Sequence, residues 1–119
     1  MAAGEYSFSI EQGATFTRTI TVRQADDSPL DLTGYKVRMM ARASYDDAVP
    51  TISLSTIEPP GGITITDPAS GQFQLNMNAA ATGALKFSKI MYDLEIESGA
   101  GLVTRLLEGN VTLIPEVTK

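Results

Sequence analysis

The residue types that most often carry out catalysis are missing from this chain or badly placed in it. The sequence of 119 residues contains neither Cys nor His. It therefore lacks a thiolate nucleophile, thiolate metal ligands and the imidazole that most often serves as a general base. Serine hydroxyls consequently have no histidine partner, and the neighbouring pair Ser88–Lys89 is too local to form a Ser–Lys dyad. The sequence predicts no nucleophilic enzyme.

Three carboxylates alternate along one segment: Asp93, Glu95 and Glu97. Residues two apart on a β-strand lie about 6.5–7 Å apart, which is superficially suitable for the acid pair of a glycosidase. The chain has no Trp to form a sugar-binding platform. Three basic side chains of an earlier segment could instead pair with these carboxylates across strands: Lys36, Arg38 and Arg42. We therefore expect a charged, solvated strand face here and no active site.

Acidic pairs and glycines in the predicted loops give no site either. Asp26–Asp27 and Asp46–Asp47 could offer oxygen ligands to Ca²⁺, but this ion takes about six to eight oxygens, and no EF-hand spacing surrounds either pair. Solvated turn residues are the simpler interpretation. Gly99–Gly101 is not a phosphate-binding loop, because no helix is predicted after it. We expect no metal and no cofactor.

Alternation of apolar and polar residues predicts β-strands along most of the chain. The predicted strands are Tyr6–Gln12, Thr15–Arg23, Tyr35–Ala43, Thr51–Thr56, Ile63–Thr66, Gln72–Met77, Ile90–Glu97, Leu102–Leu107 and Asn110–Val117. Arg18 falls on the apolar side of its strand, which indicates an edge strand or an exposed strand end. Met40 falls among outward charges, which indicates that part of this face is covered. Met39, Met77 and Met91 are expected to fill the core.

Turn residues separate these strands. The strongest turn signals are Ala25–Gly34, Glu58–Gly62, Asp67–Gly71 and Ser98–Gly101. Asn78–Leu85 predicts one or two helical turns with Asn78 as the N-cap. Glu108–Gly109 predicts a bulge or bend, and Pro115 predicts an edge strand or the end of the last strand.

About eight or nine short strands and one helical turn predict a single all-β domain over residues 1–119. Residues 1–5 are expected to form a flexible or partner-bound N-terminal segment. The expected architecture is an antiparallel Ig-like β-sandwich, and a small closed barrel is the alternative. The Cys…Trp…Cys core of antibody domains is missing, so an antibody-type domain is excluded.

Charge and hydropathy disfavour two classes of partner. The net charge is −5, and an acidic domain repels phosphate backbones, so we expect no nucleic-acid partner. No apolar run approaches the roughly 20 residues of a membrane helix. The N-terminus also lacks a basic region followed by an apolar segment. We expect no membrane partner and a protein that stays in the cytoplasm of the cell that makes it.

Four motifs in this order resemble a family of small structural proteins of tailed bacteriophages: QGATF at Gln12–Phe16, DLTGY at Asp31–Tyr35, YDLE at Tyr92–Glu95 and LLEGNVT at Leu106–Thr112. Over about residues 5–118 the chain is similar to the N-terminal Ig-like β-sandwich of phage baseplate upper proteins. The resemblance implies a non-enzymatic virion component, made in the host bacterial cytoplasm. It implies an oligomeric adaptor in the tail tip, baseplate or fibre-attachment region.

The partners implied by this resemblance are other virion proteins, namely tail, baseplate or fibre subunits in a multi-copy assembly. Larger members of the family carry long extensions that this sequence does not contain, so we expect a free-standing small subunit. A neck or head–tail connector, or a capsid decoration protein, is the alternative within the same class. A host-glycan-binding β-sandwich is the alternative from another class, although glycan platforms favour exposed aromatic rings. The candidate interface residues are Ala2, Ala3, Gly4, Glu5, Tyr6, Arg38, Arg42, Glu58, Pro59 and Pro60.

Overall fold

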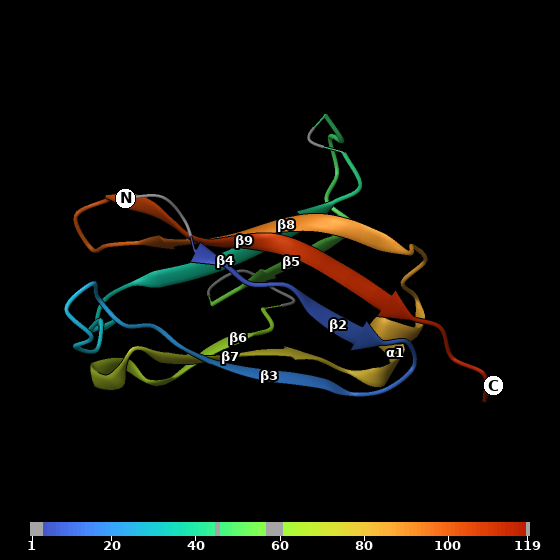
Figure 1. Ribbon diagram of the computed structural model, residues 1–119, viewed down its shortest axis with the longest axis horizontal. Helices are drawn as coiled ribbons and strands as arrows, with labels where there is room; N and C mark the ends of the chain where they lie inside the picture. Colours follow the sequence, from blue (N-terminus) through green and yellow to red (C-terminus); the bar gives the residue numbers. More distant parts are fainter. Residues whose placement is uncertain (1–3, 45, 57–60, 119) are drawn as a thin grey trace.

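The computed structural model describes residues 4–44, 46–56 and 61–118. It contains two β-sheets packed face to face, with the larger sheet above the smaller one in Figure 1. The described elements are β1 (Gly4–Glu5), β2 (Phe8–Glu11), β3 (Phe16–Thr21), β4 (Lys36–Arg42), β5 (Ile52–Ser55), β6 (Ile63–Asp67), the 3₁₀-helix η1 (Pro68–Ser70), β7 (Gln72–Met77), α1 (Ala79–Gly83), β8 (Lys89–Glu97) and β9 (Val103–Ile114). The predicted β-sandwich is confirmed.

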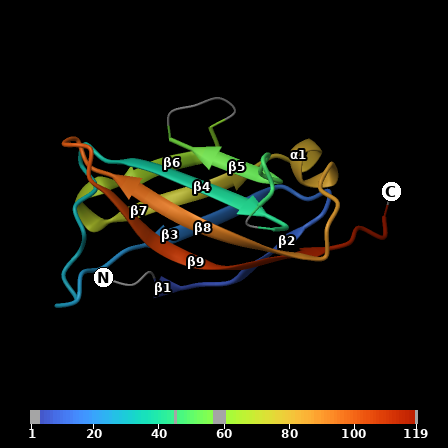
Figure 2. The same cartoon turned by 90° about the horizontal axis from the view of Figure 1, so that it is seen from above.

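The larger sheet has the strand order β1-β9-β8-β4-β5, and β2 also pairs with β9. β8 is antiparallel to both β4 and β9, whereas β1 and β2 run parallel to β9. The sandwich is therefore antiparallel except at this edge. Gly4 and Glu5, expected in a flexible or partner-bound segment, instead pair with Leu107 and Glu108 of β9. The start of the described chain thus covers one edge of the larger sheet (Figure 2).

The smaller sheet has the order β3-β7-β6 and is antiparallel throughout. β6 and β7 form a hairpin whose connection contains η1, and Gly71 takes a φ of 72° there. β3 lies at one end of this sheet, which confirms the edge position predicted from the inward parity of Arg18. The described strands form two separate sheets, joined at one corner by an isolated bridge between Ser55 and Gly62, rather than one closed barrel.

Alternate residues of the facing strands form the core between the sheets. β4 and β8 of the larger sheet bury one side-chain row each: Val37, Met39 and Ala41, and Ile90, Tyr92, Leu94 and Ile96. From the smaller sheet, Phe73 and Leu75 meet these rows and have no solvent exposure. Burial of each large apolar side chain stabilises the fold by about 1.5–3 kcal/mol. The period of two seen in the sequence therefore sorts residues correctly between the core and the outer faces.

The short helix α1 is bonded to the distant turn between β2 and β3. Asn78 caps it as predicted, because its side-chain oxygen accepts a hydrogen bond from the Ala81 N–H at 2.7 Å. The buried Thr82 hydroxyl donates to the Ala14 carbonyl at 2.8 Å and accepts from the Gly13 N–H at 3.1 Å. The helix therefore fixes the turn between β2 and β3. Within the described ranges, neither helix has the length and apolar character needed to cross a membrane.

The predicted bulge lies elsewhere on β9. Leu94 pairs with Leu107 but Glu95 pairs with Arg105, so Leu106 is the extra residue and the prediction of a bulge at Glu108–Gly109 is wrong. β9 then runs unbroken to Ile114, so the two strands predicted over Leu102–Leu107 and Asn110–Val117 are one strand and the bound at Val117 is wrong. The strand ends before Pro115, which is one of the two outcomes predicted for that proline. Glycine is required at position 109 for another reason: a Cβ there would collide with the carbonyl oxygen of Tyr6. Gly109 lets the segment between β1 and β2 pass close to β9.

Candidate partner-binding faces

The outer face of the larger sheet, called here the charged face, carries both signs of charge around two methionines. Its side chains alternate with the buried rows of β4, β5, β8 and β9. They include Lys36, Arg38, Met40, Arg42, Ser53, Ser55, Lys89, Met91, Asp93, Glu95, Glu97, Val103, Arg105, Glu108 and Asn110. The carboxylates and bases singled out in the sequence therefore lie on neighbouring strands of one open face.

Arg38 holds two of the three alternating carboxylates. Its Nε lies 3.1 Å from Glu95 Oε1 and its Nη1 lies 3.0 Å from Glu97 Oε1. The hydrogen bond from Arg38 lowers the pKa of Glu97, and the bonds to Glu97 and then Glu95 raise the pKa of Arg38. The predicted pairing is thus confirmed for Arg38. An acid–base role for this carboxylate pair is disfavoured, because one guanidinium bonds to both side chains.

Asp93 pairs with a residue that the sequence did not single out. Its carboxylate lies 3.6 Å from the Nε of Arg105, and burial, then the like charge of Glu95, raise the pKa of Asp93. Arg42, one of the predicted bases, turns instead to the Asp47 carbonyl at 3.0 Å and to Met40 Sδ at 3.7 Å. Arg105 was missed because the extra residue Leu106 shifts the parity of β9.

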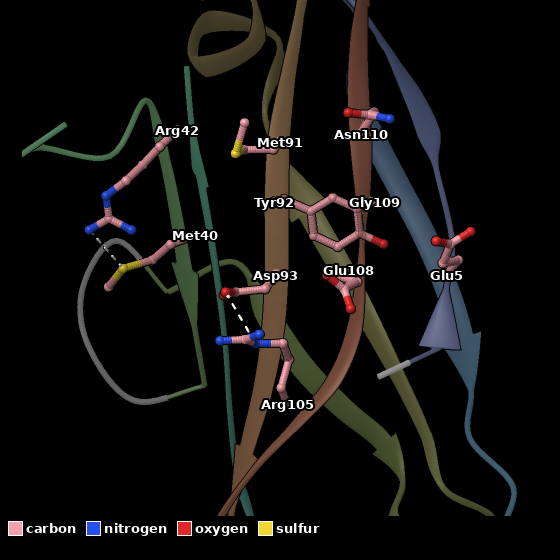
Figure 3. Close-up of a pocket in the computed structure, with 10 residues that line it drawn as sticks. All are labelled: Glu5, Met40, Arg42, Met91, Tyr92, Asp93, Arg105, Glu108, Gly109 and Asn110. Carbon is pink, nitrogen blue, oxygen red and sulfur yellow. Dashed lines mark hydrogen bonds and ion pairs between the residues drawn. The ribbon is translucent and has the colours of Figure 1, made fainter. Parts of the chain in front are cut away.

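Two methionines border a shallow pocket on the charged face, of about 340 Å³. Arg42 and Met40 lie on one side of this pocket, Met91 and Asp93 lie in its middle along β8, and Glu5 lies on the opposite side (Figure 3). Met40 is 36% exposed. Met91 is half-buried on this face, so its predicted role as core filler is wrong. Flexible thioethers beside paired charges can adapt to the side chains of a partner protein.

The predicted interface residues that the structure describes do not form one patch. Ala2, Ala3, Glu58, Pro59 and Pro60 lie outside the described residues. Gly4 and Glu5 form β1, and Glu5 and Arg42 both border the pocket. Arg38 lies farther along the charged face. Tyr6 packs against the core, and its hydroxyl accepts a hydrogen bond from Arg18 Nη1 at 2.8 Å.

The acidic loop residues act as turn caps. Asp26 accepts a hydrogen bond from the Ser28 N–H at 3.0 Å, and Asp47 accepts one from the Ser44 N–H at 3.2 Å. Asp31, in the DLTGY motif, does the same with the Thr33 N–H at 2.9 Å. The Ser28 and Thr33 bonds lower the pKa of Asp26 and Asp31. No group of three or more potential metal-ligating side chains occurs in the described part of the chain.

The outer face of the smaller sheet, called here the threonine face, is polar without being charged. Apart from Asp67 at the end of β6, its outward side chains carry only hydroxyls or amides: Thr17, Thr19, Thr21, Thr64, Thr66, Gln72, Gln74 and Asn76. Some bond to one another across strands, as Gln74 Nε2 does to Thr19 Oγ1 at 3.3 Å. The two outer faces of the sandwich therefore differ in charge.

Comparison with known proteins shows the fold alone. No protein-family model matches the sequence, and no curated protein does either. Among 185 matching chains of solved structures is a crystal structure of chicken TCR, with a TM-score of 0.55 and 11% sequence identity. The match covers 98% of this chain and 56% of that one, so this chain spans little more than half the length of its structural neighbour. Proteins that share an architecture this widely can differ in function. The chain is an Ig-like β-sandwich.

Proposed function

We propose that the protein is a non-enzymatic structural component of a tailed-phage virion. It acts there as an oligomeric adaptor in the tail tip, baseplate or fibre-attachment region, bound to other virion proteins. The starting point is the sequence resemblance, whose motifs lie at positions that matter for the fold. In QGATF, Gln12 donates from Nε2 to the Leu85 carbonyl at 2.9 Å and accepts from the Glu116 N–H at 3.0 Å. Such roles suit a motif that preserves a scaffold.

The charged face is the observation that best supports an adaptor. Three of its carboxylates, Asp93, Glu95 and Glu97, are already paired within the sheet. Met40 and Met91 lie among these pairs as polarizable apolar contacts. Protein interfaces are enriched in Met and Arg, whereas Glu and Asp are depleted in them. A flat strand face built on a rigid core can bind a partner with little ordering cost. This arrangement suits a neighbouring protein subunit better than a small substrate.

Co-expression with the products of the flanking genes tests the proposal. The chain is tagged, purified with each neighbour, and analysed by size-exclusion chromatography with light scattering. We expect a defined complex that contains several copies of the chain. Immunolabelling of purified particles then distinguishes the tail from the neck and from the capsid surface, which separates the adaptor from the connector and decoration alternatives. A monomer that binds none of the neighbouring products would contradict the proposal.

Glycan binding is the second candidate, because one observation favours it. The hydroxyls and amides of the threonine face could form hydrogen bonds with sugar hydroxyls, and no charged side chain would have to be desolvated. Against this, aromatic rings that would support stacking are placed inside: Phe8, Phe16, Phe73 and Tyr92 are buried. Retention of a defined glycan on an array, lost in Gln74→Ala and kept in Met40→Ala, would favour this second role.

A further inference from the structure

We propose that the free edge of β3 binds an extended strand of a different protein, whose acidic side chain pairs with Arg18. The partner at this edge need not be a virion protein. Three features of the edge favour such a partner: the backbone of β3, the environment of Arg18 and a hollow beside Ile20.

Along the edge of β3 that faces away from β7, backbone N–H and C=O groups have no strand partner. The Val22 N–H donates to the Gly71 carbonyl at 2.9 Å, at the end of the ladder that joins β3 to β7. Because orientation alternates along an antiparallel strand, Arg18 and Ile20 turn their backbone groups toward β7 as Val22 does. Thr17, Thr19 and Thr21 must turn theirs the other way. No strand of the described chain pairs with that side.

Arg18 is a cation without a carboxylate partner among the described residues. Its side chain points inward at the seam between the two sheets, where Nη1 donates to the Tyr6 hydroxyl at 2.8 Å. The guanidinium carbon lies 5.9 Å from the ring centres of both Phe8 and Phe16. The ion pairs found in the described structure are made by Arg38 and Arg105. A half-buried guanidinium has five N–H donors to satisfy, so a carboxylate brought to this edge would be bound strongly.

A hollow beside Arg18 adds a place for an apolar side chain. Ile20 is two residues from Arg18 and belongs to the same inward row. With Leu106 and Leu107 of β9 it lines a hollow of about 410 Å³ between the two sheets. A strand added to β3 would place alternate side chains inward. One inward side chain of the added strand would meet Arg18, and the side chain two residues away would enter the hollow.

The course of the N-terminal segment explains why this edge is open. In many Ig-like sandwiches the first strand lies beside the second, in the sheet that here contains β3, β7 and β6. In this chain β1 and β2 pair with β9 of the larger sheet instead, and β3 is left at the end of the lower layer in Figure 1. A second copy paired through its own β3 would bring another Arg18, not a carboxylate, to the seam. Charge complementarity therefore favours a different polypeptide.

Peptide binding followed by NMR tests the inference on the intact protein. The probe is a capped peptide, Thr-Val-Thr-Glu-Thr-Ala-Thr, whose antiparallel pairing sets glutamate opposite Arg18 and valine opposite Ile20. We expect amide shifts along β3 and a change in the Arg18 side-chain signals. The same peptide with glutamine in place of glutamate should bind roughly tenfold more weakly. In Arg18→Gln the two peptides should bind equally.

A pair of edge variants tests the backbone part. Thr19→Pro removes an N–H that points to the free edge and leaves the bonds to β7 in place. It should weaken peptide binding at least tenfold, whereas Thr19→Ala should leave it nearly unchanged. If Thr19→Pro does not fold, N-methylation of the threonine before the glutamate removes the matching donor from the peptide and should have the same effect. Absence of binding by the glutamate peptide, equal binding of both peptides to the parent protein, or shifts confined to the charged face would each overturn the inference.

Discussion

Arg38 joins two carboxylates of the neighbouring strand and so fixes the charge pattern at the centre of the charged face. Glu95 and Glu97 are two residues apart on β8, and both side chains pair with the same guanidinium. Exposed ion pairs contribute little to stability, but a guanidinium shared by two carboxylates also fixes their positions. The pair thus presents a partner with a preformed surface.

The effect of Arg38 on Glu97 predicts a change in acid stability. The pKa of Glu97 in the folded state is lower than its ordinary value of 4.5. Its contribution to the free energy of unfolding is therefore complete above pH 4.5 and is lost as pH falls through the folded pKa. In Arg38→Met we expect a shallower loss of stability below pH 4.5, measured by urea unfolding at a series of pH values.

Arg23→Met is the matched control for this experiment, because the Arg23 guanidinium donates to the Asp27 carbonyl oxygen. Its acid dependence should equal that of the parent protein. Asp26 and Asp31, whose pKa values are also lowered, keep their contributions in both variants. An equally steep acid loss in Arg38→Met and the parent would contradict the prediction.

Thr82 provides a second prediction at the scale of single residues. Thr82→Val keeps the shape of the side chain but leaves the Gly13 N–H and the Ala14 carbonyl without their hydroxyl partner. We expect the free energy of unfolding to fall by about 1–3 kcal/mol, the cost of unsatisfied buried polar groups. Thr64→Val on the exposed threonine face should change it by less than about 0.5 kcal/mol. Equal effects at both sites would show that the hydroxyl of Thr82 is not important.

At the scale of elements, the parallel pairing of β1 and β2 with β9 decides which edges of the sandwich are covered. The crossing between β1 and β2 passes directly over Gly109, where the Tyr6 carbonyl leaves no room for a side chain. The Tyr92 hydroxyl donates to this same carbonyl from β8. The segment between β1 and β2 is therefore held close to β9 at Gly109.

Gly109→Ala tests this fixing point. The added methyl group must push the Tyr6 segment away, so we expect a loss of roughly 1–3 kcal/mol in the free energy of unfolding. Gly99→Ala is the control, since the nearest atom to its Cβ is the Gly34 carbonyl oxygen at 3.9 Å. Chemical denaturation of both variants measures the difference. If Gly109→Ala leaves the free energy of unfolding unchanged, the N-terminal segment can shift without destabilising the fold, which would contradict the prediction.

Alternation along the chain was sufficient to predict most strands and the division between core and surface. The inward rows of β4 and β8 and the cap at Asn78 follow from local spacing alone. The parallel edge of the larger sheet and the bulge at Leu106 could not be predicted from local spacing. Pairing between distant strands depends on which register buries the inner rows of both strands. The Asp93–Arg105 pair was missed for the same reason. The charged face was therefore predicted in composition but only partly in its contacts.

At the scale of the whole molecule, the sandwich presents two outer faces of different chemistry on one core. If the charged face binds the neighbouring subunit, Met40→Glu should weaken the complex roughly tenfold, because a buried hot-spot contact is replaced by a carboxylate that must be desolvated. Thr64→Glu, the same change on the threonine face, should alter affinity less than twofold. Calorimetry on the co-purified partner measures both. The reverse order of effects would assign the contact to the threonine face.

The uncharged threonine face also gives each binding mode its own response to ionic strength. At about 0.1 M salt, interactions between exposed charges are largely screened beyond roughly 10 Å, so association through the charged face should slow and weaken as salt is added. The rate and affinity of association through hydroxyls and amides alone should barely change as salt is added. For a partner that binds one of the outer faces, a salt titration therefore distinguishes the two faces before a single residue is mutated.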